Sequence, residues 1–254
     1  MIQTIQKDKL KVLVLQDRAE LGRTAAAMAG EKIRELLAAK PEINVIFAAA
    51  PSQNEFLEAL ITDEKIEWGR INAFHMDEYL GLPDDAPQLF SSFLKRSIFN
   101  RVAFKSVNCI KGAAADADAE CERYASLLKE HPADIVCMGI GENTHIAFND
   151  PHVAEFNDTK MVKVVTLDMA CRRQQVNDEC FAAIDDVPEY AITLTVPALM
   201  SATHLFCMVP GANKADAVQR TLAEPVSELY PSTILRTHDS CVLFADKNSS
   251  MIVD

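Results

Sequence analysis

The sequence lacks several features that would define its class at once. It contains no apolar run of about 18 residues, which a membrane-spanning helix needs, and its first eight residues hold no apolar signal-peptide core. None of its seven cysteines forms a C-x-x-C pair, so neither a zinc site nor a disulfide framework is predicted. We therefore expect a cytoplasmic protein whose cysteines are buried free thiols.

Positive charge is also scarce. Lys and Arg number 25 against 37 Asp and Glu, which gives a formal net charge of −12. We expect no nucleic acid and no membrane as partner, because phosphate backbones attract clustered Lys and Arg. A small anionic ligand stays compatible with this charge, since it needs only two or three local donors.

The order of apolar runs and amphipathic segments predicts the fold class. Expected strands are 10–15, 45–50, 71–76, 135–139, 205–209 and 241–245, and expected helices are 17–39, 56–61, 117–129 and 214–222. Such alternation predicts an α/β protein with a mostly parallel sheet and helices on both faces. We expect residues 1–254 to form one domain. Segment 149–186 fits poorly and is interpreted as a lid-like excursion near the site.

Two acids follow the expected strand 71–76. In a parallel α/β sheet, ligands bind beyond the carboxyl ends of the strands, where Asp77 and Glu78 are expected to lie. A partly desolvated carboxylate there suits general acid–base catalysis. The alternative is structural, with Asp77 capping a turn and Glu78 in solvent.

A second candidate follows the expected strand 135–139, in the stretch GIGENTHIAFNDP at 139–151. Gly139 and Gly141 let the backbone approach a ligand, and His145 is a natural proton shuttle. A dinucleotide fingerprint is a weak alternative, because Thr144 replaces its third glycine. A metal site from His145, Asp150 and His152, or a purely structural turn, are the other interpretations, and the first lacks a second ligand cluster.

Two further strand ends suggest an anion site. Ser52, Gln53 and Asn54 begin a helix after strand 45–50, and helix N-termini bind phosphate; a capping box from Ser52 to Glu55 is the alternative. Lys214 stands near a helix start, which opposes the helix dipole unless an anion is present.

Paired arginines in the excursion suggest a second contact to an anion. Arg172 or Arg173 can clamp an anion in bidentate fashion, although a solvated charged face is the ordinary interpretation. We choose Arg172 as the candidate ligand.

These motifs, taken together, resemble one family. MDEYLGL at 76–82, GIGENTHIAFNDP at 139–151, VPEYAIT at 187–193 and GANKA at 211–215 are similar, in this order, to the glucosamine-6-phosphate deaminase/isomerase family. The resemblance spans roughly residues 10–245. The superfamily is shared with 6-phosphogluconolactonases.

The resemblance implies a Rossmann-like fold and an enzyme that needs no metal and no nucleotide cofactor. It implies opening of the sugar ring, aldose–ketose isomerisation and loss of ammonia from a hexosamine 6-phosphate. Asp77 matches the general base, Glu78 its acidic neighbour and His145 the ring-opening histidine. Lys214 matches a phosphate ligand, and Ser52 with Asn54 falls where the family has its phosphate loop. The family includes monomers and larger assemblies, so a homo-oligomer stays open.

This sequence also departs from the family pattern, which indicates a divergent subgroup. Asn143 replaces an Asp, Thr144 a Gly and Asp150 a Glu in the histidine turn, and the phosphate loop lacks its glycines. The replaced acids normally orient and polarise the histidine, so Asn143 and Asp150 join the candidate catalytic residues.

Three other functions compete. A 6-phosphogluconolactonase is disfavoured because Tyr79 stands where that family has Arg. A non-catalytic sugar-phosphate sensor is disfavoured because it needs no proton shuttle. Galactosamine 6-phosphate is an open alternative to glucosamine 6-phosphate, since nothing in the sequence fixes the C4 epimer.

Overall fold

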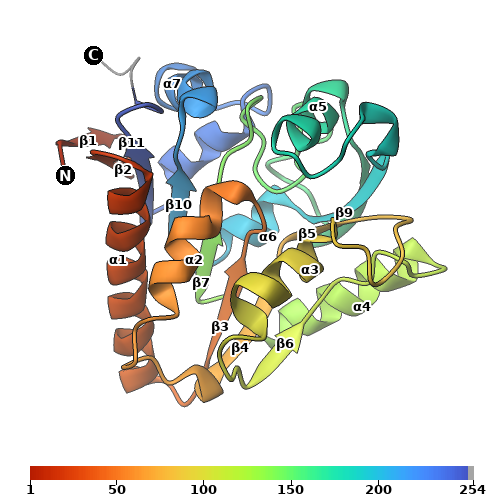
Figure 1. Cartoon of the computed structure of the whole chain (residues 1–254), viewed down its shortest axis with the longest axis horizontal. Coiled ribbons are helices and arrows are strands. Elements are labelled where there is room, and N and C mark those ends of the chain that lie inside the picture. The colour runs from red at the N-terminus through yellow and green to blue at the C-terminus, as the bar shows by residue number, and fades with distance from the viewer. Residues whose placement is uncertain (251–254) are drawn as a thin grey trace.

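A large, mostly parallel sheet forms the centre of the computed structural model, which describes residues 1–250 (Figure 1). Its eight strands follow the order β1-β2-β11-β10-β7-β3-β4-β6, and only the β1–β2 pair is antiparallel. The strands are β1 (Gln3–Lys7), β2 (Leu10–Leu15), β3 (Ile43–Phe47), β4 (Ile71–His75), β6 (Ser106–Asn108), β7 (Ile135–Met138), β10 (His204–Val209) and β11 (Cys241–Asp246). The six predicted strands are confirmed, with shifts of one to three residues at some ends.

Helices cover both faces of this sheet, as predicted for the α/β class. The helices are α1 (Arg18–Ala39), α2 (Asn54–Leu60), α3 (Phe90–Leu94), α4 (Ala117–Glu130), α5 (Met169–Asn177), α6 (Val196–Met200) and α7 (Ala215–Ala223). Short 3₁₀ turns span Pro51–Gln53, Trp68–Arg70, Ile184–Asp186, Ala212–Lys214 and Pro231–Thr237, and a π turn spans Lys95–Phe99. One apolar core lies under α1, α2 and α3, and the other under α4, α6 and α7.

Local capping explains where the first long helix begins. The Asp17 carboxylate accepts a hydrogen bond from Glu20 N at 2.7 Å, and the Glu20 carboxylate accepts one from Gln16 N at 2.7 Å. The predicted capping pattern from Ser52 to Glu55 is wrong, because α2 begins at Asn54 without a side-chain cap. The Glu55 carboxylate instead pairs with Arg18, at 2.9 Å from Nε.

A second, antiparallel sheet of three strands was not predicted. It has the order β5 (Asp77–Tyr79), β9 (Tyr190–Leu194) and β8 (Val162–Thr166). Segment 149–186, interpreted from sequence as an excursion, supplies β8 to this sheet and then forms α5. α5 lies at the upper right of Figure 1, on the side where the central strands end.

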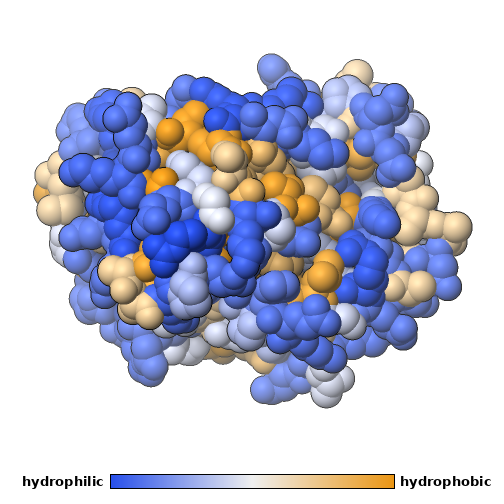
Figure 2. Space-filling model, turned by 90° about the horizontal axis from the view of Figure 1, so that it is seen from below, coloured by the Kyte–Doolittle hydropathy of each residue, from blue (hydrophilic) through white to orange (hydrophobic). Residues whose placement is uncertain are grey.

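The face seen from below in Figure 2 is mostly hydrophilic, with small apolar areas between charged side chains. Among residues 1–250, no helix is long and apolar enough to cross a membrane.

Close packing of α1 on α2 yields a first prediction. A Cβ atom at Gly22 would lie 2.5 Å from Glu55 Cβ and 2.6 Å from the Glu55 carbonyl carbon. Because this contact involves backbone, we expect Gly22→Ala to lower the free energy of unfolding by about 1–3 kcal/mol. Thermal or denaturant unfolding measures this loss.

Gly69→Ala serves as the matched control, because the nearest atom to its added Cβ is 3.9 Å away. Equal stability of the two variants would show that α2 gives way to the methyl group and that the contact is not tight.

Candidate functional site

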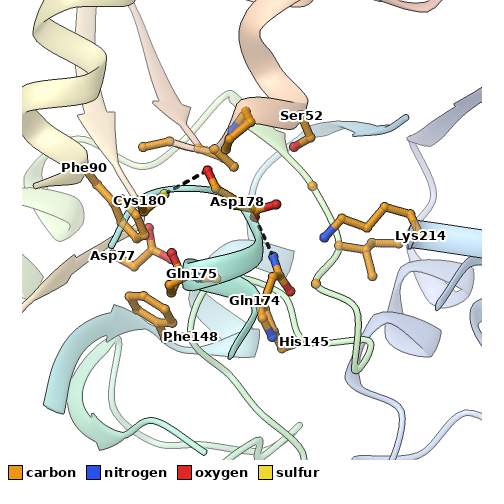
Figure 3. A pocket seen from close by; sticks show the side chains of 18 of the residues that line it. Ser52, Asp77, Phe90, His145, Phe148, Gln174, Gln175, Asp178, Cys180 and Lys214 are labelled. Atoms are coloured by element: carbon orange, nitrogen blue, oxygen red, sulfur yellow. Dashed lines mark hydrogen bonds between the residues drawn. The ribbon is translucent and has the colours of Figure 1, made fainter. Parts of the chain in front are cut away.

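A pocket lies where the neighbouring strands β4, β3, β7 and β10 end. Residues 48–52, 76–77, 139–141 and 210–214 contribute to its lining from these strand ends, and residues 145–148 and 174–180 contribute from other sides. Figure 3 shows Asp77 and Lys214 on opposite sides of the pocket, with His145 below and Ser52 above. The sheet therefore brings together four segments that lie far apart in the sequence.

Asp77 is the acid that faces the pocket. It begins β5 directly after β4, pairs with Thr193 of β9, and is 7% exposed. Burial, followed by the charge of Glu78, raises the pKa of Asp77 well above its usual range. A carboxyl group with a raised pKa is suited to take up and return a proton.

Glu78 turns the other way, because successive residues of a strand point to opposite faces. One carboxylate oxygen accepts from Tyr79 N at 3.1 Å and Phe90 N at 2.9 Å, and the other accepts from Ser91 N at 2.9 Å. Burial raises the pKa of Glu78, although these hydrogen bonds oppose the shift. Glu78 lies outside the pocket lining and holds α3 against β5.

His145 is oriented by two side chains on its own turn. Its Nδ1 lies 2.6 Å from Asn143 Oδ1 and 3.0 Å from Asp150 Oδ1. Asn143 and Asp150 stand where the family pattern has two acids. Of these two residues only Asp150 carries a carboxylate, and it contacts the imidazole directly. Such a contact fixes the orientation of the imidazole ring, as a proton shuttle requires.

Asn143 is the centre of this network. Its Nδ2 donates to Asp150 Oδ1 at 2.9 Å and to Asp168 Oδ2 at 3.3 Å, while its Oδ1 accepts from His145. Burial alone would raise the pKa of Asp150, but hydrogen bonds from His145 and Asn143 bring it below its usual value. An amide fits here because two carboxylates need a donor between them.

Gly139 and Gly141 are required because neighbouring side chains approach their backbone too closely to leave room for a Cβ atom at an ordinary contact distance. A Cβ atom at Gly141 would lie 2.1 Å from His145 Cε1, so the imidazole packs directly on the glycine backbone. At Gly139 a Cβ atom would lie 3.1 Å from Gln53 Nε2 and 3.3 Å from Ser52 Oγ. Thr144 adopts a left-handed conformation at φ 71°, which glycine adopts without strain.

The predicted phosphate loop is only partly in the pocket. Ser52 lines it, and its Oγ accepts from Gln53 Nε2 at 3.0 Å. Gln53 is 1% exposed and lies behind the lining, where Nε2 also approaches Met138 O at 3.3 Å. Asn54 is exposed and borders a different surface hollow, so the structure does not bring it to the site.

The two predicted cations behave differently. Lys214 lines the pocket and is 5% exposed; burial lowers its pKa, while nearby Asp178 and Glu142 oppose the shift. Arg172 lies outside the pocket lining, and its Nη2 donates to Ile184 O at 2.8 Å and Val187 O at 3.0 Å. The structure thus does not place Arg172 as an anion clamp, because its guanidinium is engaged within its own segment.

Sequence reasoning missed several polar residues of the pocket. They are Arg18, Gln174, Gln175, Asp178 and Asn213. Arg18 carried a signal, since an arginine at a helix start opposes the dipole just as Lys214 does. Gln174 of α5 and Asp178, which caps its C-terminal end, lie four residues apart, in the segment that was interpreted from sequence as a lid-like excursion near the site.

Among residues 1–250, two groups of side chains lie close enough together to hold a metal ion. They are His145, Asp150 and Cys171, and Asp150, His152 and Asp168. The set of His145, Asp150 and His152 considered from sequence is not one of them, and His152 Nε2 lies 3.2 Å from Thr166 Oγ1. The hydrogen bonds of Asp150 account for both groups without an ion, so the expectation of no metal stays a prediction.

The family is established by comparison with known proteins. A family model described as glucosamine-6-phosphate isomerases/6-phosphogluconolactonase matches residues 16–244, and the chain belongs to this family. Two similar relatives are named glucosamine-6-phosphate deaminase. That of Streptococcus equi subsp. equi is 29% identical over 96% of this chain and 100% of its own length. That of Streptococcus sanguinis is 31% identical over 94% of this chain and 97% of its own length.

Solved structures agree with this assignment. A monomeric glucosamine-6-phosphate deaminase, described as a missing link of the NagB superfamily, superposes with a TM-score of 0.86 at 29% identity, covering 95% of this chain and 99% of its own. A 6-phosphogluconolactonase from Thermotoga maritima superposes with a TM-score of 0.75 at 20% identity, covering 93% and 99%. The second likeness shows a shared fold alone.

The role of Asn143 yields a second prediction. Asn143→Asp restores the acid of the family pattern but removes the donor between Asp150 and Asp168 and adds a third carboxylate. We expect it to lower the free energy of unfolding by about 2 kcal/mol, because hydrogen bonds to charged groups contribute about 1.5–3 kcal/mol each. Urea unfolding at neutral pH measures the loss, which should shrink on acidification.

Asn54→Asp is the control, since it makes the same chemical change at an exposed position outside the site. If Asn143→Asp proved as stable as this control, the amide would not be bridging two ionised carboxylates.

Proposed function

We propose that this chain isomerises and deaminates a hexosamine 6-phosphate, with glucosamine 6-phosphate as the leading substrate and fructose 6-phosphate and ammonia as products. One observation carries this: a buried acid with a raised pKa, Asp77, shares a pocket with an acid-oriented His145 and an unpaired cation, Lys214. Isomerisation needs a group that removes a proton from one carbon and returns it to the next, which suits Asp77. Ring opening needs a proton shuttle, which suits His145, and the phosphate needs a cation, which suits Lys214. Family membership and the names of the relatives support the assignment.

The residues suggest an order of steps. His145 takes the proton from the C1 hydroxyl and gives it to the ring oxygen as the bond between C1 and that oxygen breaks, which opens the sugar to an aldehyde. Asp77 removes the proton from C2 while a proton from solvent is added to O1, which gives an enolamine. Asp77 then returns its proton to C1, which leaves C2 as an iminium ion, and the proton taken from solvent is released again when water adds to C2. Water adds to C2 and ammonia leaves, so the ketose forms without any change in oxidation state overall. Phe90 and Phe148, stacked at 5.4 Å between centroids, line the pocket with apolar surface that disfavours water near Asp77.

Lys214 and Ser52 form the proposed anion end. Within residues 1–250, the Lys214 ammonium forms no ion pair, so a bound phosphate can take that place. Ser52 Oγ and the backbone near Gly139 and Gly141 provide further polar groups at the strand ends.

The cellular compartment and the state of assembly are further parts of the proposal. All seven cysteines are free thiols, which is typical of a reducing compartment and supports the cytoplasm. A homo-oligomer stays a prediction beside the monomer, since a similar solved structure is of a deaminase described as monomeric.

The proposal is tested by incubating the purified full chain with glucosamine 6-phosphate, without added metal or nucleotide. We expect stoichiometric release of ammonia and fructose 6-phosphate. Galactosamine 6-phosphate and 6-phosphogluconolactone are run in parallel, so that use of the C4 epimer or lactone hydrolysis identifies a different member of the family. Binding of the sugar phosphates without any turnover would overturn the enzymatic proposal and favour a sensor.

The variant Asp77→Asn tests two things separately, the role of Asp77 as a base and the effect of its buried carboxylate on stability. We expect Asp77→Asn to abolish isomerisation while sugar-phosphate binding survives, because the amide cannot accept the C2 proton. A buried carboxyl with a raised folded pKa costs stability once pH rises through its unfolded pKa. The variant should therefore gain on the order of 1 kcal/mol at neutral pH, which raises Tm by about 2–4 °C.

The wild-type pH profile gives a further readout. Because Asp77 must be ionised to act as base, kcat/KM should rise with pH through its raised pKa. Asp84→Asn, at an exposed loop position, is the control and should leave both activity and Tm unchanged. Near-normal turnover of Asp77→Asn would remove Asp77 from the base role.

A further inference from the structure

The anion end of the pocket contains a carboxylate that the proposed chemistry does not use. Asp178 lines the pocket at the C-terminal end of α5, and Figure 3 shows its side chain pointing inward between Ser52 and Gln174. Glu179 follows in a left-handed conformation, φ 59°, which ends the helix and fixes the direction of the turn. Asp178 is thus built into the cavity wall.

A partly buried network of hydrogen bonds connects Asp178 to the histidine turn. Gln174 is 6% exposed; its Oε1 accepts from Glu142 N at 2.8 Å, and its Nε2 donates to Asp178 Oδ2 at 3.3 Å. Asn213 Nδ2 in turn donates to Glu142 Oε1 at 2.9 Å, which connects this network to the Lys214 turn. An amide and an acid of α5 therefore occupy the wall where an anion-binding site would ordinarily present cations.

Charged groups face Asp178 from several elements. Lys214 and Glu142 act on it from the strand ends, and His145 acts from its turn. Arg18 of α1 also interacts with it, but that guanidinium is already held by Glu55 and the Pro51 carbonyl. Lys214 is therefore the cation available to both Asp178 and an incoming anion.

We propose that Asp178 makes this end of the pocket selective for charge: its ionised carboxylate opposes a doubly charged phosphate, and a proton is taken up when such a group binds. The inference rests on the proposed function in taking the ligand to be a phosphate. The protonated acid donates a hydrogen bond to a phosphate oxygen, whereas the carboxylate repels it and competes for Lys214. Asp178 is a specificity-determining residue in this account, not a proton carrier.

The surroundings of Asp178 favour the protonated form of its carboxyl group. Burial raises the pKa of Asp178, while Lys214 opposes the shift in the empty pocket. A phosphate dianion that pairs with Lys214 weakens this opposition and adds a like charge, so both effects favour the protonated acid. Phosphate affinity should therefore fall as pH rises through the pKa of Asp178.

The test is titration calorimetry of the purified full chain with inorganic phosphate and with glucose 6-phosphate, from mildly acidic to mildly alkaline pH. Two buffers of different ionisation enthalpy report proton uptake directly. Asp178→Asn keeps the shape and hydrogen-bonding capacity of the side chain but cannot ionise. Asp185→Asn, exposed on the neighbouring 3₁₀ turn, is the matched control, and Lys214→Ala marks loss of the anion end.

We expect wild type and Asp178→Asn to bind phosphate equally at acidic pH. At alkaline pH the variant should bind several-fold more tightly, because only the wild-type chain must then take up a proton in order to bind. Taking the ratio of the two Kd values cancels the ionisation of phosphate itself, whose second pKa is about 6. Proton uptake should be present in wild type and Asp185→Asn and lower in Asp178→Asn.

Three results would overturn the proposal. The first is equal proton uptake by wild type and Asp178→Asn, and the second is no gain in affinity at alkaline pH. The third is weaker binding of glucosamine 6-phosphate by the variant with glucose 6-phosphate unaffected, which would show that Asp178 recognises the amine. If the variant does not fold, absence of proton uptake by wild type overturns it. Phosphate binding without turnover would count against the proposed function and leave this test intact.

Discussion

The site depends on Met76, where the chain passes from the large parallel sheet into the small antiparallel one. The Met76 carbonyl accepts from Leu194 N at 2.8 Å, and the next residue is already paired in β5. Strand alternation from this point directs Asp77 into the pocket and Glu78 onto the N-terminus of α3. One peptide unit thus separates an acid that faces the pocket from an acid whose hydrogen bonds hold α3 against β5.

In the histidine turn the residues differ from the family pattern, but a carboxylate still lies beside the imidazole. The expected family pattern has two acids beside the histidine, whereas this chain has Asn143 and Asp150 there. A further carboxylate, that of Asp168 at the N-terminal end of α5, accepts a hydrogen bond from Asn143. The imidazole still contacts a carboxylate, and the amide keeps two neighbouring carboxylates apart. The position of Asn143 between Asp150 and Asp168 explains the amide, because its Nδ2 donates to both carboxylates.

The sequence predicted the strands of the central sheet and the strand-end location of Asp77, His145 and Lys214, because buried parallel strands are short apolar runs and their carboxyl ends meet at one edge. It did not predict the small sheet, since β5 has only three residues and the five residues of β8 (VKVVT) and of β9 (YAITL) show no regular alternation of apolar and polar side chains. The side chains of Arg172 and Asn54 do not line the pocket, and the sequence did not reveal this for a different reason. The direction of a side chain depends on the exact register of a helix, which capping and packing set, and residue type does not reveal it.

α5 has a consequence for how molecules reach the pocket. Its buried side chains are one cysteine and two glutamines, Cys171, Gln174 and Gln175, so little apolar surface attaches it to the protein. Polar contacts exchange readily for water, and the free energy of releasing such a helix is correspondingly small. Detachment of α5 would withdraw Cys171 and the partly buried Val176 from the first apolar core, a smaller loss of apolar contact than detachment of α1, which buries Leu21, Ile33 and Leu37 there.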